Sequence, residues 1–170
     1  ICSTYKSDND TDMPLSDRIN YIYNNQDLKC QSNCDISSYL SDSISNTGAN
    51  AFIGAGRGND FVTNIVANVT VEGGAGDDSI TNSGLNALIE ASDGDDVIDN
   101  SGVRALILGD DGNDTIRNSA ANVTLDGGAD NNLISLAASA QNVLIRYSLG
   151  GGNDSIVGYT QFDTIKLDGV

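Results

Sequence analysis

Acidic residues recur at a fixed interval along this chain of 170 residues. Starting from Asp60, the equivalent residue returns at intervals of 18, 18, 18, 18 and 22 positions. Carboxylates that recur at one period can stack in a row once the chain coils, and a row of carboxylate oxygens can bind a hard cation. The residues at the repeated position after Asp60 are Asp78, Asp96, Asp114, Asn132 and Asp154.

A glycine-rich stretch precedes each repeated residue, and an aliphatic residue follows two positions after it. The template is Gly-Gly-x-Gly-x-Asp-x-aliphatic-x, as in Gly73 to Asp78 followed by Ile80. Glycine adopts positive φ readily, so such a turn can aim several backbone carbonyls into one concavity. Calcium takes about six to eight oxygens from carboxylates and carbonyls. The pattern therefore predicts calcium binding at these turns.

This template resembles the RTX (haemolysin-type) calcium-binding nonapeptide repeat. The resemblance covers about residues 42–158 and implies an all-β, right-handed parallel β-roll, a β-solenoid with 18 residues per coil. It also implies that each ion lies between turns one coil apart and is held by the acidic residue of both. Carried over, three good sites lie between Asp60 and Asp78, Asp78 and Asp96, and Asp96 and Asp114. A weaker fourth site would use Asp114 with Asn132, where one charge is lost.

The sequence departs from the family pattern because only alternate nonapeptides carry the metal motif, so we expect a single row of ions. The pairing of Asn132 with Asp154 is in doubt, since a four-residue insertion at Leu136 to Gln141 can break the register. The predicted metal-binding residues are Gly56, Gly58, Asp60, Gly73, Gly74, Ala75, Gly76, Asp78, Ala91, Ser92, Asp93, Gly94, Asp96, Gly109, Asp110, Asp111, Gly112, Asp114, Gly127, Ala129, Asn132 and Asp154.

A second half-repeat, rich in asparagine, lies between the glycine-rich stretches. Asparagine tolerates left-handed backbone conformations and can hydrogen-bond to its equivalent one coil away. Because this half-repeat lacks carboxylates, we expect a structural ladder there and little or no metal. The predicted ladder is Asn46, Asn64, Asn82, Asn100 and Asn118, with Asn50, Asn68, Asn86 and Asn122 beside it.

The strands between the two kinds of turn should alternate inward and outward side chains. The inward positions predict two facing parallel sheets around a thin aliphatic core, for example Ile80 facing Ile89. One outward row mixes apolar residues and threonine. A second outward row is too irregular to favour ice binding. These rows are Phe52, Thr70, Leu88, Leu106 and Thr124, and Thr63, Thr81, Asp99, Arg117 and Ser135.

Four segments are expected along the chain. Residues 1–11 form a flexible lead-in, and residues 12–41 a helical N-terminal cap that covers the solenoid end. In the cap, Asp12-Met13-Pro14 predicts a helix start, and the spacing of Ile36 and Leu40 predicts a second short helical turn. Residues 42–158 form the β-roll. Residues 159–170 form a C-terminal capping strand whose pattern still continues at Val170, which favours a truncated end.

The three cysteines, Cys2, Cys30 and Cys34, all precede the repeats. One disulfide with a spare thiol and three free thiols are both open alternatives. The segment that carries them also leaves two interpretations open. It is either a simple cap on the apolar solenoid end or an independent binding segment.

Composition and charge exclude several classes of function. The formal net charge is −16, from 24 acidic and 8 basic residues, which disfavours nucleic acid and anionic membrane surfaces as partners. No apolar run is long enough to span a membrane, so we expect no membrane insertion. The chain has no histidine, so a His-Glu-x-x-His protease site and a Ser-His-Asp triad are absent. We therefore expect a protein that is not an enzyme.

The resemblance implies a calcium-binding module of a larger secreted bacterial protein, which folds outside the cell and serves as a scaffold. Carboxylates stacked at about 4.8 Å repel each other by about 1 kcal/mol per pair even in water, so folding should be coupled to calcium. The alternative is a calcium-dependent extracellular binding module, an adhesin or polysaccharide-binding segment with a surface glycan or protein as partner. A metal-free solenoid, in which Gly and Asp only form tight turns, also stays open.

Overall fold

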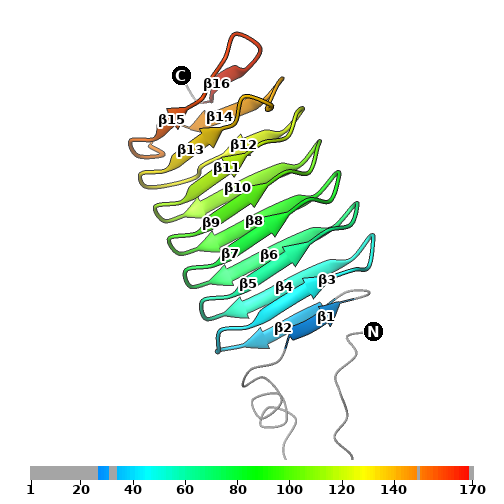
Figure 1. Cartoon of the computed structure of the whole chain (residues 1–170). Coiled ribbons are helices and arrows are strands. Elements are labelled where there is room, and N and C mark those ends of the chain that lie inside the picture. Colours follow the sequence, from blue (N-terminus) through cyan, green and yellow to red (C-terminus); the bar gives the residue numbers. More distant parts are fainter. Residues whose placement is uncertain (1–26, 31–33, 149, 169–170) are drawn as a thin grey trace, which may run out of the picture.

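The computed structural model describes residues 27–30, 34–148 and 150–168, which form two parallel eight-stranded sheets (Figure 1). Odd-numbered strands make one sheet and even-numbered strands the other. The first sheet contains β1 (Asp27–Cys30), β3 (Ser43–Asn46), β5 (Phe61–Asn64), β7 (Ser79–Asn82), β9 (Val97–Asn100), β11 (Thr115–Asn118), β13 (Leu133–Leu136) and β15 (Ser155–Val157). The second contains β2 (Cys34–Ser38), β4 (Phe52–Arg57), β6 (Thr70–Ala75), β8 (Leu88–Asp93), β10 (Leu106–Asp111), β12 (Thr124–Asp126), β14 (Leu144–Ser148) and β16 (Thr164–Asp168).

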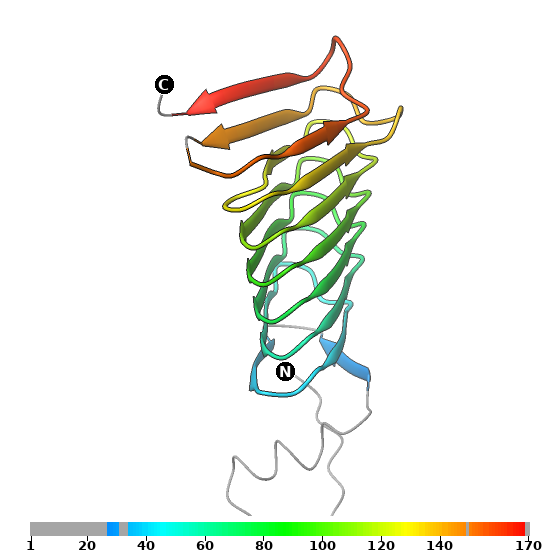
Figure 2. The same cartoon turned by 90° about the vertical axis from the view of Figure 1, so that its left-hand side faces the viewer.

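The chain is a parallel β-solenoid of about seven turns with about 18 residues per turn, as the repeat predicts. Each coil runs through one strand of each sheet, and the next coil stacks directly on it (Figure 2). The register follows the sequence period, because Phe61 pairs with Ser79 and Ser79 with Val97. The strands are only three to six residues long, so each coil depends on its neighbours for most of its hydrogen bonds.

The core is a thin double layer of aliphatic side chains between the two sheets. From the odd-numbered strands, Val62, Ile80 and Ile98 point inward and are fully buried. From the even-numbered strands, Val71 and Ile89 meet them and are equally buried. Inward and outward residues alternate along each strand, which is why small and β-branched residues suffice for this core. The prediction of two facing aliphatic rows is confirmed.

Both predicted outward rows are present as single columns. The register aligns Phe52 with Thr70 and Thr70 with Leu88 in the even-numbered sheet. In the odd-numbered sheet, Asp99 aligns with Arg117, and the two side chains form an ion pair at 3.3 Å. Both partners are more than half exposed, so this ion pair contributes little stability.

The solenoid begins earlier than residue 42, in the segment that the sequence assigns to a helical cap. The expected second helical turn near Ile36 and Leu40 is wrong, because this segment forms β2. Strand β2 pairs with β4, with Cys34 opposite Ile53, and Cys34 lies buried in the core. Pairing with an existing sheet satisfies the backbone of this short segment better than an isolated helical turn. The expected lead-in and the helix after Asp12 lie outside the described residues.

The four-residue insertion does not break the register, because it is divided between two turns. The offset between paired residues is 18 at Asn118 and Leu136, and it becomes 20 at Thr124 and Leu144. It reaches 22 where Leu133 pairs with Ser155. Two extra residues therefore lie before β14 and two after it. The prediction that all four lie between Leu136 and Gln141 is wrong.

The last strand, β16, extends the even-numbered sheet by pairing with β14. This confirms the strand predicted around Ile165 and Leu167, whereas Phe162 lies in the preceding turn and is exposed. Ile165 occupies the inward column but is 40% exposed, because β16 lies at the edge of its sheet. No helix that could cross a membrane occurs among the described residues.

Candidate metal centre

The two edges of the solenoid carry different turns. We call the edge formed by the glycine-rich turns, which end in Asp60, Asp78, Asp96, Asp114, Asn132 and Asp154, the Asp edge. The opposite edge, where Asn46, Asn64, Asn82, Asn100 and Asn118 begin the turns, is the Asn edge. Each coil contributes one turn to each edge, so the two edges can be compared residue by residue.

Stacking brings the predicted glycine-loop residues into continuous columns along the Asp edge. The register places Gly74 between Gly56 and Ser92, and Ala75 between Arg57 and Asp93. In these columns Asp93, Asp110 and Asp111 are exposed residues, in contrast to the buried repeated aspartates. The columns are Gly73, Ala91, Gly109 and Gly127; Gly56, Gly74, Ser92 and Asp110; Ala75, Asp93, Asp111 and Ala129; and Gly58, Gly76, Gly94 and Gly112.

Two glycines show how closely other atoms approach this turn, although Ala91 takes the position of Gly73 one coil later. Gly76 has a φ of +127°, a conformation that other residues rarely adopt, and a Cβ there would strike the carbonyl oxygen of Gly58. At Gly73, a Cβ would lie 2.5 Å from Asp78 Oδ2 and 2.6 Å from the carbonyl oxygen of Ala91. A carboxylate oxygen and a carbonyl oxygen of the next coil therefore face the same small space beside Gly73.

The repeated acidic residues form an inner row that ties each coil to the one before it. The Oδ1 atom of Asp78 accepts a hydrogen bond from the backbone N–H of Asp60 at 2.7 Å. The same bond recurs from Asp78 to Asp96 at 2.7 Å and from Asp96 to Asp114 at 2.8 Å. The row also extends to Asp42, whose N–H donates to Asp60 Oδ1. One oxygen of each carboxylate is thus used to hold the backbone.

The second carboxylate oxygen of this inner row is buried without a hydrogen-bond donor. This is true of the Oδ2 atoms of Asp60, Asp78, Asp96 and Asp114, and each of these residues is at most 2% exposed. The space beside Oδ2 holds another acceptor instead, such as Ala91 O near Asp78 and Gly127 O near Asp114. Two acceptors facing each other in a dry site repel unless a proton or a cation lies between them.

Burial shifts the acidity of these residues strongly. Loss of solvation raises the pKa of Asp60 and Asp96 to about 7, although a backbone hydrogen bond to each carboxylate opposes the shift. The same causes raise the pKa of Asp78 and Asp114 to about 6. Neighbouring carboxylates add to these shifts, from within the inner row at Asp60 and Asp96 and from outside it at Asp78 and Asp114. The charged form of the inner row therefore needs compensation that the surrounding protein atoms do not supply.

Asn132 is the exception in the inner row. Its Oδ1 accepts the N–H of Asp114 at 2.8 Å, as an aspartate would. Its Nδ2 donates to the carbonyl oxygen of Ala129 at 2.9 Å, so both polar atoms of this amide are satisfied. The row continues to Asp154, whose Oδ1 accepts the N–H of Asn132 at 2.9 Å. The doubtful pairing of Asn132 with Asp154 is therefore present.

An outer row, which sequence reasoning missed, lies on the exposed side of the Asp edge. Here Oδ1 of each residue accepts the N–H of its equivalent in the following coil, for example Asn113 N–H to Asp95 Oδ1 at 2.7 Å. The inner and outer rows thus bind neighbouring coils in opposite directions. The signal was visible in the sequence, because the residue before every repeated position is Asn or Asp. The outer row is Asn59, Asp77, Asp95, Asn113, Asn131 and Asn153.

The predicted asparagine ladder is present along the Asn edge. Each Nδ2 donates to Oδ1 of the next ladder residue, with distances of 2.9, 2.7, 2.8 and 2.8 Å from Asn46 to Asn118. Each Nδ2 also donates to a carbonyl oxygen two residues on, for example from Asn82 to Gly84 at 3.0 Å. The neighbouring column of Asn50, Asn68 and Asn86 has φ values between +55° and +58°.

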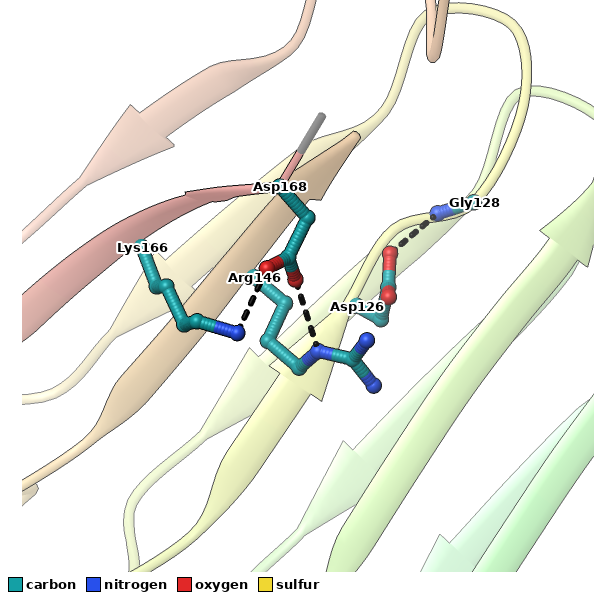
Figure 3. A network of polar contacts seen from close by, with 5 residues as sticks. All are labelled: Asp126, Gly128, Arg146, Lys166 and Asp168. Atoms are coloured by element: carbon teal, nitrogen blue, oxygen red, sulfur yellow. Dashed lines mark hydrogen bonds and ion pairs between the residues drawn. The ribbon is translucent and has the colours of Figure 1, made fainter. Parts of the chain in front are cut away.

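Acidic residues near the C-terminal end have protein donors. Asp168 accepts from Arg146 Nε at 3.2 Å and pairs with Lys166 Nζ at 2.5 Å, while Asp126 accepts the N–H of Gly128 at 3.2 Å (Figure 3). Hydrogen bonds from Lys166 and Arg146 lower the pKa of Asp168. These carboxylates therefore differ from those of the inner row in having hydrogen-bond donors nearby.

The chemistry of the inner row fits a hard cation. Carboxylate and carbonyl oxygens are the ligands that calcium prefers. Among the described residues no three His, Cys, Asp or Glu side chains converge on one point, so a cation here would take part of its oxygens from the backbone. The residues placed to hold it are the repeated aspartates with the carbonyl at the first turn position of the following coil, as in Asp78 with Ala91 and Asp114 with Gly127.

Of the three cysteines, the structure describes the side chain of Cys34. Cys34 is disulfide-bonded, which excludes three free thiols. Cys2 and the side chain of Cys30 lie outside the described residues.

Searches with this sequence find no matching protein-family model and no matching curated protein.

Proposed function

We propose that this chain is a calcium-binding module of the RTX β-roll type, part of a larger secreted bacterial protein, and that it completes its fold on binding calcium outside the cell. Its role is that of a structural scaffold. Calcium would occupy a single row along the Asp edge, between successive glycine-rich turns of a right-handed roll.

One observation carries this proposal. Four Oδ2 atoms, those of Asp60, Asp78, Asp96 and Asp114, are buried in register without a donor. The neighbouring atoms identified beside Asp78 and Asp114 are carbonyl oxygens of the following coil. A cation at each step would neutralise the carboxylate and satisfy both oxygens, whereas a proton could serve only where the pKa lies near the ambient pH.

The same observation supports coupling between binding and folding. The oxygens that would surround one ion belong to two coils, so the site exists only when the coils are stacked. Ions that bind only the stacked form stabilise it in proportion to their affinity and concentration. Without ions, the raised pKa values mean that ionising the inner row works against folding.

The first experiment is a calcium titration of metal-free protein followed by far-UV circular dichroism and thermal melting. We expect a steep gain of β signal and a higher melting temperature in calcium. Magnesium serves as the matched control, because it requires a tighter octahedral shell and gives up water reluctantly. A protein that melts at one temperature in chelator and in calcium would contradict the proposal and favour the metal-free solenoid.

A specific surface favours a second function, the calcium-dependent extracellular binding module. A groove of about 390 Å³ lies on the outer face of the odd-numbered sheet, where it meets the Asn edge. Its lining includes the polar residues Asp99, Ser101, Arg117 and Ser119, although most of the surface exposed inside the groove is apolar. Hydroxyl, carboxylate and guanidinium groups side by side can bind the hydroxyls of a saccharide. The groove runs over several coils, so a linear glycan is the ligand class that it suits.

This second function is tested on a glycan array in calcium. Binding should fall at least tenfold in Arg117→Ala, which removes the only cation of the groove lining. Arg104→Ala, an exposed cation on the Asn edge outside the groove, is the matched control. An array without hits in calcium would leave only the scaffold role.

A further inference from the structure

The inner row changes chemistry at the fifth of the six glycine-rich turns, that of Asn132, where an amide replaces the carboxylate. In the turn of Asp114, the atoms nearest to a Cβ added at Gly109 are Asp114 Oδ2 and Gly127 O, the same pair of oxygens as at Gly73. In the turn of Asn132, the atoms nearest to a Cβ added at Gly127 all belong to Asn132 itself, with Nδ2 at 2.9 Å. The carbonyl of the following coil is no longer among the three nearest atoms.

The amide of Asn132 performs internally what an ion would do at the other turns. Its Nδ2 lies where the unpartnered Oδ2 lies in an aspartate turn, and it donates to Ala129 O at 2.9 Å. A donor therefore joins the side chain to a carbonyl of its own glycine-rich turn. Asp114, one coil earlier, receives no such help, because its Oδ2 is buried without a donor.

The glycine-rich turn of the following coil also has a side-chain donor of its own. In the register of β12 and β14, Arg146 lies opposite Asp126. Tyr147 therefore takes the place in its coil that Gly127 takes in the previous one. The hydroxyl of Tyr147 donates to Gly152 O at 2.6 Å. A carbonyl of the last glycine-rich turn is thus held by a side chain of the protein. Asp154 Oδ1 also accepts the backbone N–H of Asn132 at 2.9 Å.

We propose that the row of calcium sites includes the turn of Asp114 as a full member and ends at Asn132, whose amide takes the place of an ion and holds its own turn closed without metal. This rests on the proposed function and fixes where the row stops. The sequence predicted a weakened site at Asp114. In this proposal the site at Asp114 is complete, because the loss of charge at Asn132 affects the site of the next turn instead.

The test counts bound ions by native mass spectrometry and follows melting in chelator. In Asn132→Asp the donor becomes a second acceptor against Ala129 O, so we expect one additional calcium per chain and a lower melting temperature in chelator. Asn131→Asp is the matched control, because it adds the same charge one residue away in the exposed outer row. That variant should bind as many ions as the unchanged protein.

Asp114→Asn provides a second, independent measurement, because it introduces the amide one coil earlier and should remove one calcium. The inference is overturned if Asn132→Asp binds no additional ion, or if Asp114→Asn retains them all, while the unchanged protein binds calcium. If the unchanged protein binds no calcium, the proposed function fails instead, so the two failures can be told apart.

Discussion

The Asp edge and the Asn edge use nearly isosteric side chains at the same period, but only the Asn edge has a complete set of side-chain hydrogen bonds. On the Asn edge, Asn82 donates to Asn100 at 2.8 Å and accepts from Asn64 at 2.7 Å. On the Asp edge, Asp78 accepts one backbone N–H with Oδ1, and its Oδ2 has no donor. Both residues are almost fully buried. An amide carries one donor and one acceptor group and can close a ladder by itself, whereas an ionised carboxylate carries acceptors only.

The comparison teaches that one fold can contain a self-sufficient edge and an edge that depends on its surroundings. Neutral amides make the Asn edge indifferent to pH and to ions. We expect the buried carboxylates to make the Asp edge responsive to both, since a proton or a cation can supply the partner that the protein does not.

The largest effect should come from placing a carboxylate on the Asn edge. In Asn82→Asp, an oxygen replaces Nδ2 and faces Asn100 Oδ1 and Gly84 O. An unpaired buried charge costs about 3–5 kcal/mol, and calcium should not restore this loss, because the amide ladder offers no metal site. Denaturant unfolding measures the change. Asn86→Asp, in the exposed neighbouring column, is the control and should change stability little.

The reverse exchange should have the opposite sign in chelator. In Asp78→Asn, Oδ1 can keep the bond to Asp60 N–H while Nδ2 turns toward Ala91 O. Satisfying a buried acceptor should raise the free energy of unfolding by about 1–3 kcal/mol. In calcium the variant should lose part of its ion-induced stabilisation. Chelator and calcium melts of the same samples separate these effects, and destabilisation in chelator would contradict this account of the Asp edge.

The pH dependence of stability without calcium also distinguishes the Asp edge from the Asn edge. The folded-state pKa values of Asp60, Asp78, Asp96 and Asp114 lie at about 6 to 7, above the ordinary value of 3.8. The folded state therefore binds more protons than the unfolded state in this window, and stability falls as pH rises from about 4 to about 7. In chelator we expect the melting temperature to be higher at pH 5 than at pH 8. Calcium should flatten this dependence, because it competes with protons.

The smallest effect concerns backbone conformation at the two edges. On the Asn edge the positions with positive φ include Asn50, Asn68 and Asn86, whereas on the Asp edge most of these positions are glycine. Ser92, at a φ of +85°, lacks that freedom, so Ser92→Gly should stabilise the protein by about 1 kcal/mol. Ser79→Gly, in strand β7, is the control and should destabilise it by roughly 0.5–1 kcal/mol. Denaturant midpoints measured in calcium compare the two.

Much of the fold could be predicted because the sequence repeat has the same period as the coils of the solenoid. The period of 18 residues gives the coil length, the alternation around Ile80 gives the core, and the recurrence of Asn82 gives the ladder. The candidate site was located through the same recurrence. The N-terminal strands could not be predicted, since β2 carries no repeat signal and gains its conformation only by pairing with β4.

By itself, the sequence determined which residues must stack, because a fixed period leaves one register in which aliphatic residues face inward and Asx residues form columns. Only the tertiary structure decided what the stacked side chains encounter. In the inner row each side chain accepts a hydrogen bond from the preceding coil, and in the outer row from the following coil. The structure also divides the insertion between two turns and buries one oxygen of Asp78 beside a carbonyl of the next coil. Those outcomes depend on directions and distances between coils, which a one-dimensional period does not contain.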